Sequence, residues 1–527
     1  MEVRALFTEC NEPLWVEVAA ELGRLAGWRP VYWVGLDSLE DEVRQRFAGV
    51  AFHSKLAAIR GLPSPDAGHL APMPLDQPRL TRLAPCEGVV LRLLDRMDPR
   101  GSFSLRERLD LYYRYLGYWG AVLGHYRPQA VFFPIAPHMA YDYALYVLCQ
   151  ERGIPTIMLE QALIASLLFP MARFEDQENL VTRAYRRLLA ADQGGEIVLS
   201  PAARASLESL RGPYKRPFYV DRMGNGGAGG AGGLGQAWRR AKDAPHRLAG
   251  LGQGAWNILT RPAPLNYVKV KGRPYQGAPI GHARFEYYRW LGRRKKRQLK
   301  ALYDSLARPP RLDEPYVYLP LHYQPEMSTL PTGGYFEDQR LLAGLIHACL
   351  PEGWRLYVKE HPVQVAPVGK GQYSRDFDFY RQLLALPGVG LVPLDQSSFE
   401  LIDHARAVAT ITGQAAWEAV NRGKPALTFG HCWYRGCEGV HFIQDEGSCR
   451  RALAAIAAGQ GVDDRKIWLF AQAVEQAACR GYISAIFGRE YGIGREENIA
   501  AIAQALAAYW RDEIGGGGGA PREEGQA

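Results

Sequence analysis

Two short motifs in the second half of the chain carry residues suited to phosphate chemistry. One is Lys359–Pro362 (Lys-Glu-His-Pro), and the other is Thr412–Pro425, which begins Thr-Gly-Gln. Each follows a short apolar run, so each is expected at the carboxyl end of a strand, where open α/β sheets bind ligands. A histidine beside a helix start, and a Thr-Gly turn that opens a helix, can both bind phosphate. The motifs favour a nucleotide-bound substrate.

Each motif offers specific donors and acceptors. His361 is expected to donate a hydrogen bond to a leaving phosphate, and the backbone N–H groups of Thr412 and Gly413 to face an anion. Glu418 follows Gln414 by about one helical turn, so both are expected on one side of the helix. The remaining candidate binding residues also lie at or just after predicted strands: Gln324, Glu326, Lys359, Glu360, Ser397 and Ser398. For the two serines, a plain helix cap is the alternative.

A group that activates the acceptor is expected from the first half of the chain. His138 and Asp142 follow the predicted strand Ala130–Pro134, and Glu160 follows the predicted strand Thr156–Leu159. A carboxylate or histidine at this edge could accept a proton, and a carboxylate could instead attack an anomeric carbon. Glu160 and His138 are the leading pair, and Glu9 is a further candidate.

No metal site is predicted. Asp376-Phe377-Asp378 matches a pattern that binds metal in some transferases, but here it precedes a helical run, where an acidic helix cap is the better interpretation. The eight cysteines are scattered without paired CxxC spacing, which argues against zinc and fits a reducing compartment.

The elements that would position these residues alternate between strand and helix. The chain opens with a predicted strand, Val3–Thr8, a helix, Trp15–Ala26, and a strand, Val31–Val34. From Tyr316 the alternation is strict, with short connections, which predicts a parallel sheet covered on both faces. The predicted fold class is α/β, with two doubly wound, Rossmann-like domains that face each other across a cleft.

The predicted domain boundaries follow from these patterns. Residues 1–220 form an acceptor-side domain, and residues 313–490 form a nucleotide-sugar-binding domain. Between them, residues 221–312 hold the glycine-rich stretch Gly224–Gly235 and a basic helical connector. A helix over 491–514 and a disordered tail over 515–527 complete the chain.

Composition limits the classes of partner. The formal charge of +8 over 527 residues is too mild for a dedicated nucleic-acid binder. Arg293–Arg297 is a compact basic run, either a solvated helix face or a surface for anionic lipid or glycan. The start of the chain lacks the plan of a signal peptide, and Ala162–Ala172 is too short to span a bilayer. A cytoplasmic protein is predicted, peripheral at the inner face of the membrane if the run binds lipid.

The ordered motifs resemble a known family. Pro320–Glu326, Val358–Pro362 and Thr412–Pro425 are similar to the capsular polysaccharide biosynthesis and export-associated transferases, across roughly residues 314–445. That family includes enzymes that add 3-deoxy-manno-octulosonic acid (Kdo) to capsule lipid anchors. The resemblance implies the two-domain GT-B fold, a nucleotide-sugar donor such as CMP-Kdo, a glycan or glycolipid acceptor, and no separate cofactor. It also implies that Glu418 contacts the nucleotide ribose.

Three other functions fit the same pattern. A polyol-phosphate transferase of teichoic-acid type and a sugar-nucleotide epimerase share the two-domain plan. A non-catalytic scaffold of the capsule assembly machinery could also keep the fold.

Overall fold

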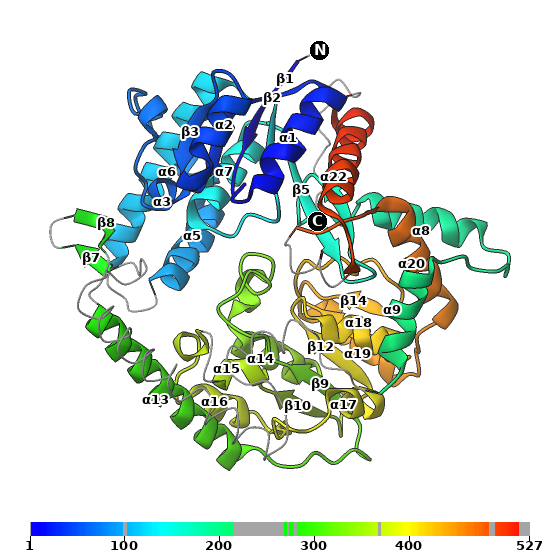
Figure 1. Ribbon diagram of the computed structural model, residues 1–527. Helices are drawn as coiled ribbons and strands as arrows, with labels where there is room; N and C mark the ends of the chain where they lie inside the picture. The colour runs from blue at the N-terminus through cyan, green and yellow to red at the C-terminus, as the bar shows by residue number, and fades with distance from the viewer. Residues whose placement is uncertain are drawn as a thin grey trace, which may run out of the picture.

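The computed structural model describes residues 2–98, 103–213, 268–270, 273–278, 282–366, 370–483, 488 and 491–515. Two sheets organise these residues into two domains, one above the other in Figure 1. The first sheet has the strand order β15-β6-β5-β4-β1-β2-β3, in which β1 to β5 run parallel. The second has the order β11-β10-β9-β12-β13-β14 and is parallel throughout. In both sheets the order reverses at the centre, as in doubly wound nucleotide-binding folds.

The first domain is built mainly from the first two-fifths of the chain. Its elements are β1 (Val3–Phe7), α1 (Pro13–Ala26), β2 (Trp28–Gly35), α2 (Glu40–Arg46), β3 (Ala51–Ser54), α3 (Lys55–Ile59), α4 (Gln77–Arg82), α5 (Ala84–Met97), α6 (Leu105–Tyr126), β4 (Ala130–Phe133), α7 (Ala140–Glu151), β5 (Thr156–Ala162), β6 (Leu167–Met171), α8 (Leu180–Ala191) and α9 (Pro201–Arg211).

Both faces of the first sheet are buried, which explains its apolar strands. Leu6, Val131 and Met158 pack on one face in a cluster with α5, α6 and α7. Phe7 and Phe132 pack on the other face in a cluster with α1 and α22. A parallel sheet covered on both sides needs strands that are apolar throughout, and β4 is buried at every residue.

The second domain follows the connector. Its elements are β9 (Tyr316–Pro320), α14 (Gln339–Cys349), β10 (Arg355–Lys359), α15 (Pro362–Val365), α16 (Phe379–Leu384), β11 (Val389–Leu391), α17 (Ser398–His404), β12 (Ala407–Thr410), α18 (Gln414–Asn421), β13 (Ala426–Thr428), β14 (Val440–Phe442), α19 (Glu446–Ala457) and α20 (Asp464–Ala477). Helices α14, α16 and α19 cover one face of the second sheet, and α17 and α18 cover the other.

The chain then returns to the first domain. Strand β15 (Cys479–Arg480) pairs antiparallel with β6, and helix α22 (Arg495–Tyr509) packs beside α1 (Figure 1). A short π-helix, Trp510–Gly515, ends the described residues. The sequence prediction had placed the residues of β15 in the second domain, but their partner strand belongs to the first sheet.

The connector is described only in part. Strands β7 (Val268–Val270) and β8 (Arg273–Ala278) pair with each other, and α13 (His282–Leu306) leads into the second domain. Leu299 and Tyr303 of α13 are fully buried in the core of that domain. The glycine-rich stretch Gly224–Gly235 lies outside the described residues.

The predicted fold class is confirmed: the chain is an α/β protein with two Rossmann-like domains. Most predicted elements are present within two residues of their predicted ends. Strand β2 begins three residues before its predicted start, and β5 ends three residues after its predicted end. The antiparallel strands β6 and β15 and the elements between residues 37 and 97, where the sequence pattern was unclear, were not predicted.

Candidate active site

The centre of the second sheet carries a compact polar junction. His322 follows β9, and Thr410 ends the neighbouring strand β12. The Thr410 hydroxyl and the Thr412 N–H both lie within hydrogen-bonding distance of His322 Nε2, at 2.9 and 3.3 Å. Because that nitrogen accepts the Thr412 N–H, the imidazole is neutral, and burial lowers its pKa to about 3.

This junction corrects the expectation for the Thr-Gly turn. The Gly413 N–H donates to Thr410 Oγ1 at 3.1 Å, and the Thr412 N–H donates to His322, so neither faces an open anion site. The Thr412 hydroxyl donates to the Ser328 carbonyl at 2.7 Å. The turn therefore fixes the loops after β9 and β12 against each other.

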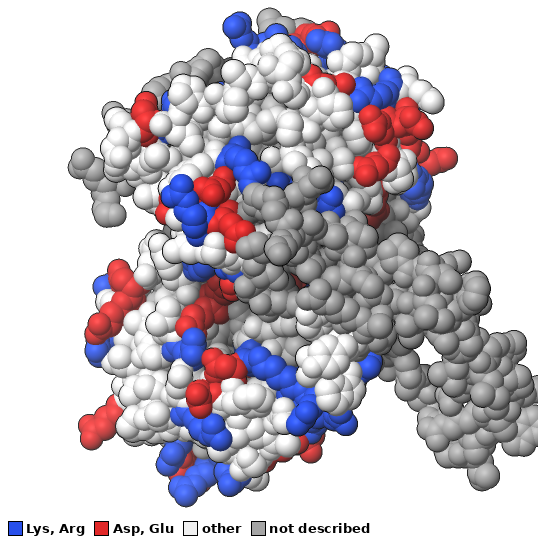
Figure 2. Space-filling view, turned by 90° about the vertical axis from the view of Figure 1, so that its left-hand side faces the viewer, with Lys and Arg blue, Asp and Glu red and all other residues white. Residues whose placement is uncertain are grey.

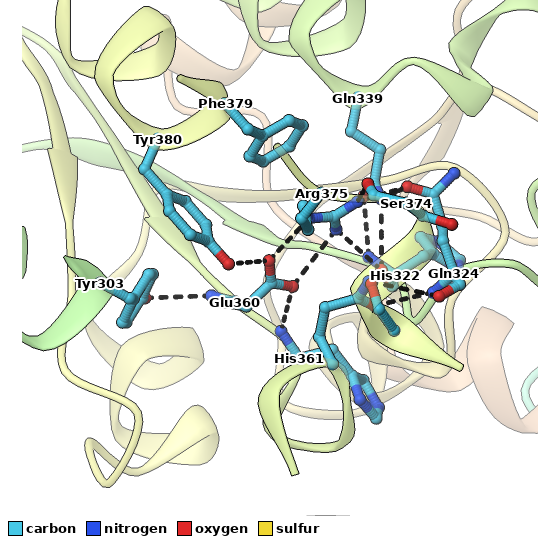
Figure 3. Close-up of polar contacts among 12 residues, drawn as sticks. Tyr303, His322, Gln324, Gln339, Glu360, His361, Ser374, Arg375, Phe379 and Tyr380 are labelled. Atoms are coloured by element: carbon cyan, nitrogen blue, oxygen red, sulfur yellow. Dashed lines mark hydrogen bonds and ion pairs between the residues drawn. The ribbon is translucent and has the colours of Figure 1, made fainter. Parts of the chain in front are cut away.

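A buried ionic network lies beside the junction (Figure 3). The guanidinium of Arg375 donates to Glu360 at 2.7 Å, to Gln324 Oε1 at 2.6 Å and to the His322 carbonyl at 3.3 Å. The Tyr380 hydroxyl donates at 2.7 Å to Glu360 Oε2, the same oxygen that accepts the hydrogen bond from Arg375 Nε. Both ionic side chains are fully buried. Breaking such a pair would leave an uncompensated charge, so the network rigidly fixes the loops that it joins.

Gln324 and Glu360 were predicted to contact the nucleotide, and the network shows otherwise. The Gln324 amide bonds Arg375, Gln339 and the Glu337 carbonyl. One Glu360 oxygen also accepts the His361 N–H at 2.8 Å. The polar atoms of both residues are bonded to protein groups. Gln324 and Glu360 therefore help to position His322 and His361.

Lys359, Ser397 and Ser398 also form hydrogen bonds within the protein. Lys359 Nζ donates to the Gln396 carbonyl and to Ser398 Oγ, the latter at 3.2 Å. Ser397 caps α17 by accepting the Glu400 N–H at 3.3 Å. The helix-cap alternative therefore holds for Ser397, and Ser398 and Lys359 support the strand end after β11.

His361 keeps one nitrogen directed away from these contacts. It is the N-cap of α15, and its Nδ1 accepts the Val363 N–H at 3.2 Å. A ring nitrogen that accepts cannot carry the proton, so in the neutral ring Nε2 carries it and is a donor. Burial lowers the pKa of His361 to about 4, which keeps the ring neutral near pH 7. The side chain is partly exposed, so Nε2–H can reach a ligand.

Helix α18 brings a buried carboxyl to the same edge. Glu418 is 9% exposed, and burial raises its pKa to about 7, opposed by Arg422. Gln414, one turn earlier, has a buried side-chain oxygen with no hydrogen-bond partner. The unsatisfied Gln414 oxygen fits a ligand that supplies a hydroxyl or amino donor. Glu326, after β9, is exposed and accepts the Ser328 hydroxyl at 2.9 Å.

In the first domain, His138 has the opposite tautomer to His361. Its Nδ1 lies 3.2 Å from the Ala136 carbonyl, which can only accept, so Nδ1 carries the proton. Nε2 is then an unprotonated acceptor. Burial lowers the pKa of His138, so the ring stays neutral, and the side chain remains partly exposed.

Asp142 lies behind His138. It is 1% exposed, and its Oδ2 accepts the His138 N–H at 3.2 Å. The prediction that it reacts with the acceptor is wrong for this geometry, since a carboxyl sealed behind the loop cannot reach a substrate. It orients His138.

Glu9, the further candidate, lies two residues after β1 in a left-handed conformation with φ of 58°. It accepts Lys55 Nζ at 2.6 Å, Asn11 at 3.0 Å and the Tyr141 hydroxyl. These three donors occupy both carboxylate oxygens, so protein groups hold Glu9 in place. Glu9 therefore shapes the electrostatics beside His138.

Arg96 of α5 joins the two domains at this point. Its guanidinium donates to the His138 carbonyl and, at 3.0 Å, to the Leu330 carbonyl of the second domain. The loop after β4 and the loop after β9 therefore meet through one side chain. The carboxyl edges of the two sheets face each other here.

Glu160 lies within strand β5, because β5 continues to Ala162 and turns back as β6. It is not at a strand end, which was the reason for selecting it. Burial raises its pKa to about 7, opposed by Arg435 of the second domain. The carboxyl therefore lies close enough to the second domain to interact with the charge of Arg435.

Of the acidic pair 376/378, Asp376 caps the start of α16, and Asp378 makes no side-chain cap hydrogen bond. Asp376 accepts the N–H groups of Asp378 and Phe379 at 3.0 and 2.7 Å, at the start of α16. In the described part of the chain, no three His, Cys, Asp or Glu side chains are grouped to hold a metal ion.

Sequence reasoning missed three residues of this site: His322, Arg96 and Arg375. His322 follows β9 as His361 follows β10, and that shared position was a usable signal. The sequence holds no comparable signal for Arg96 and Arg375, because only the fold brings their partners close to them.

Known proteins resemble parts of this chain. Residues 292–448 match the family model described as capsule polysaccharide biosynthesis protein. The match confirms the family resemblance for this segment, which runs from α13 to α19. No curated protein matches the chain.

Three solved structures show weak overall likeness. The KpsC beta Kdo 2,7 transferase of Thermosulfurimonas dismutans is 18% identical over 35% of this chain and 53% of its own, with a TM-score of 0.22. The match thus spans about half of that chain. The beta Kdo 2,4 transferase of the same KpsC is 13% identical over 66% and 79%, with a TM-score of 0.25. UDP-GlcNAc 2-epimerase from Methanocaldococcus jannaschii is 9% identical over 90% and 100%, with a TM-score of 0.24.

Proposed function

We propose that this protein is a GT-B glycosyltransferase that moves a sugar from a nucleotide-sugar donor to a surface-polysaccharide or lipid-anchor acceptor. The observation that carries the proposal is the pair of histidines with opposite tautomers. His361 presents a proton at the carboxyl edge of the second sheet, and His138 presents a lone pair at the carboxyl edge of the first. The family match over residues 292–448 supports the capsule context.

In the proposed reaction, the donor nucleotide binds the second domain, with its ribose at Glu418. The acceptor hydroxyl oxygen attacks the anomeric carbon as His138 Nε2 takes its proton. The bond from that carbon to the phosphate oxygen breaks, and the phosphate leaves with the bonding electrons. His361 Nε2–H stabilises the charge that develops on the phosphate. No separate cofactor or metal takes part in this proposal.

This route predicts inversion at the anomeric carbon, because one displacement occurs and no enzyme carboxylate forms a bond to the sugar. If Glu160 were the nucleophile instead, two displacements would retain the configuration. The stereochemistry of the product therefore distinguishes the two assignments.

The donor is proposed to be a CMP-activated ulosonic acid such as CMP-Kdo. A thermal-shift screen of CMP-, CDP-, UDP- and GDP-sugars tests this, since a ligand that binds only the folded state raises Tm. We expect the CMP-sugar to give the largest shift and to be hydrolysed slowly without acceptor. Stabilisation by a UDP-sugar together with formation of its epimer would support an epimerase. Stabilisation by a CDP-polyol would support a polyol-phosphate transferase. If none of the nucleotide-linked compounds bound, a non-catalytic scaffold would be supported.

The acceptor would be held where the two domains meet, and the protein is proposed to work in the cytoplasm at the inner membrane face. No described helix is long and apolar enough to cross a bilayer.

A further inference from the structure

Helix α13 carries an aromatic stripe on its solvent-exposed side. Tyr287, Trp290 and Leu291 are 56%, 45% and 36% exposed, although such side chains usually lie inside a protein. The rings of Tyr287 and Trp290 stack at 6.2 Å, and the Arg294 guanidinium lies 5.7 Å from the Trp290 ring. Residues three or four positions apart share one helix face, so these side chains form a continuous strip.

A groove runs beside this stripe. It has a volume of about 490 Å³, and its mostly apolar wall includes Leu291 and Tyr288 of α13 with Tyr373 and Phe377 from the segment before α16. Gly292 permits the close approach, because a Cβ there would lie 3.0 Å from the Gln372 amide nitrogen. Phe377 is 41% exposed, so the apolar surface continues from the helix onto a second segment.

The predicted basic run borders the stripe, but it is not one uniform patch. Arg293, Arg294 and Arg297 are exposed and Lys295 is half-buried, whereas Lys296 is 3% exposed and faces the protein. Figure 2 shows Lys and Arg side chains gathered over this part of the second domain. Two exposed acidic residues lie nearby, Asp376 and Asp378, which pair with Arg340 and Arg381.

Aromatic rings flanked by arginines match the chemistry of a bilayer interface. Tyr and Trp favour the headgroup level, where an apolar ring and a polar tip are both satisfied. Cations near the surface are attracted to anionic lipid. A soluble anionic glycan can stack on Tyr287 and Trp290, but it offers no acyl chains to bury Leu291 and Phe377, which are 36% and 41% exposed.

We infer that this face of α13, together with the groove at Phe377, docks the protein on an anionic lipid bilayer. The rings enter the interface and the arginines bind the headgroups. The inference extends the proposed function, because it would bring the transferase to a lipid-anchored acceptor, but docking needs no catalysis.

Vesicle co-sedimentation of the full chain tests this, with phosphatidylcholine vesicles that contain or lack phosphatidylglycerol. We expect binding to the anionic vesicles only, and weaker binding as salt rises. Tyr287→Ser with Trp290→Ser should reduce affinity about tenfold or more and keep the salt dependence, since apolar burial is lost. Arg293→Gln with Arg297→Gln should reduce affinity about tenfold and flatten the salt dependence.

Matched controls lie elsewhere on the same domain. Leu341→Ser removes an apolar side chain that is 57% exposed on α14, and Arg450→Gln with Arg451→Gln removes two exposed charges from α19. Both should bind vesicles like the unaltered protein. Transfer to a short soluble acceptor should be unchanged in every variant, which separates this inference from the proposed function.

Three results would overturn the inference. The first is no binding to anionic vesicles. The second is binding that the aromatic pair of substitutions leaves unchanged, which would indicate a purely ionic site for a polyanion. The third is an equal loss in the control variants.

Discussion

At the scale of single residues, backbone partners decide the chemistry of the two central histidines. A backbone N–H bonded to Nδ1 makes His361 a donor through Nε2, and a backbone carbonyl bonded to Nδ1 makes His138 an acceptor through Nε2. Both partners come from within two residues of the histidine, so the local loop fixes each tautomer. The wider network around Glu360 and Asp142 then fixes the loops.

The site residues were only partly predictable from the sequence, because the role of each side chain depends on its partners in the fold. The histidines follow apolar strands, and that position is visible in the sequence. Whether a carboxyl faces a ligand or another side chain depends on partners that the fold brings in, as Arg375 does for Glu360. Glu360 and Gln324 were therefore identified as important but given the wrong role.

Glu418 makes a prediction about stability and pH. Burial raises its folded pKa to about 7, above the ordinary value of 4.5, so the folded state holds a proton that the unfolded state has lost. The stabilisation is present at low pH and is lost as pH rises from about 4.5 to 7. Glu418→Gln keeps the protonated shape without titrating. Thermal unfolding should show a smaller fall in Tm between pH 5 and pH 8, by roughly a few degrees.

Glu496→Gln, in the first turn of α22 and exposed, is the control and should leave the pH dependence unchanged. If Glu418→Gln had the same pH dependence as the unaltered protein, the Glu418 carboxyl would be ionised in the folded protein and paired with another group of the chain.

At the scale of elements, the parallel strands were the most predictable feature. Strands buried on both faces appear in the sequence as apolar runs, and the strict alternation predicted from Tyr316 begins there, with β9. The β5–β6 hairpin was missed because its turn carries no glycine or asparagine signal. Ala165 and Ser166 adopt left-handed φ values of 49° and 57°, and the buried Ser166 hydroxyl donates to the Gly481 carbonyl at 2.7 Å. Tertiary contacts hold this turn, so local sequence gave no sign of it.

The turn between β12 and α18 makes a prediction at this scale. Gly413 has an ordinary φ of −74°, but a Cβ would lie 2.7 Å from Thr410 Oγ1 and 3.2 Å from His322 Nε2. Gly413→Ala should therefore lower the free energy of unfolding by about 1–3 kcal/mol and weaken nucleotide binding, because the junction must open. Chemical denaturation and nucleotide titration would measure the two effects.

Gly344→Ala is a matched control. It lies inside α14, and an added Cβ would meet nothing within 4 Å. It should stabilise the protein by roughly 0.5–1 kcal/mol, since alanine favours the helix. Equal behaviour of the two variants would contradict the steric account.

At the scale of the whole molecule, the two domains share a hydrophobic core. Leu330 and Trp417 of the second domain belong to the same buried cluster as α5, α6 and α7 of the first. Phe470 of α20 contacts Tyr185 of α8 on one side and Trp417 on the other, with ring centroids 5.2 and 6.0 Å apart. A large apolar interface restricts relative domain motion. The site is therefore largely assembled before ligand binds.

This shared core predicts one unfolding transition. Differential scanning calorimetry should show a single peak, and Trp417→Ala should lower its temperature without splitting it, since the lost packing serves both domains. Two well-separated peaks in the unaltered protein would show that the domains unfold independently and that the interface is weak.

The central claim is that a base from one domain and a donor from the other act on one reaction. The direct measurement compares sugar transfer and nucleotide affinity in His138→Gln and His361→Gln, with the donor that the thermal screen selects. We predict that His138→Gln lowers kcat by about 10²–10⁴-fold and leaves nucleotide affinity within about threefold, because the nucleotide binds the other domain. His361→Gln should lower kcat by about 10²–10³-fold and weaken nucleotide binding only modestly, because most of the nucleotide contacts remain. If His138→Gln transferred sugar at the unaltered rate, or lost nucleotide binding together with transfer, the two-domain mechanism would be contradicted.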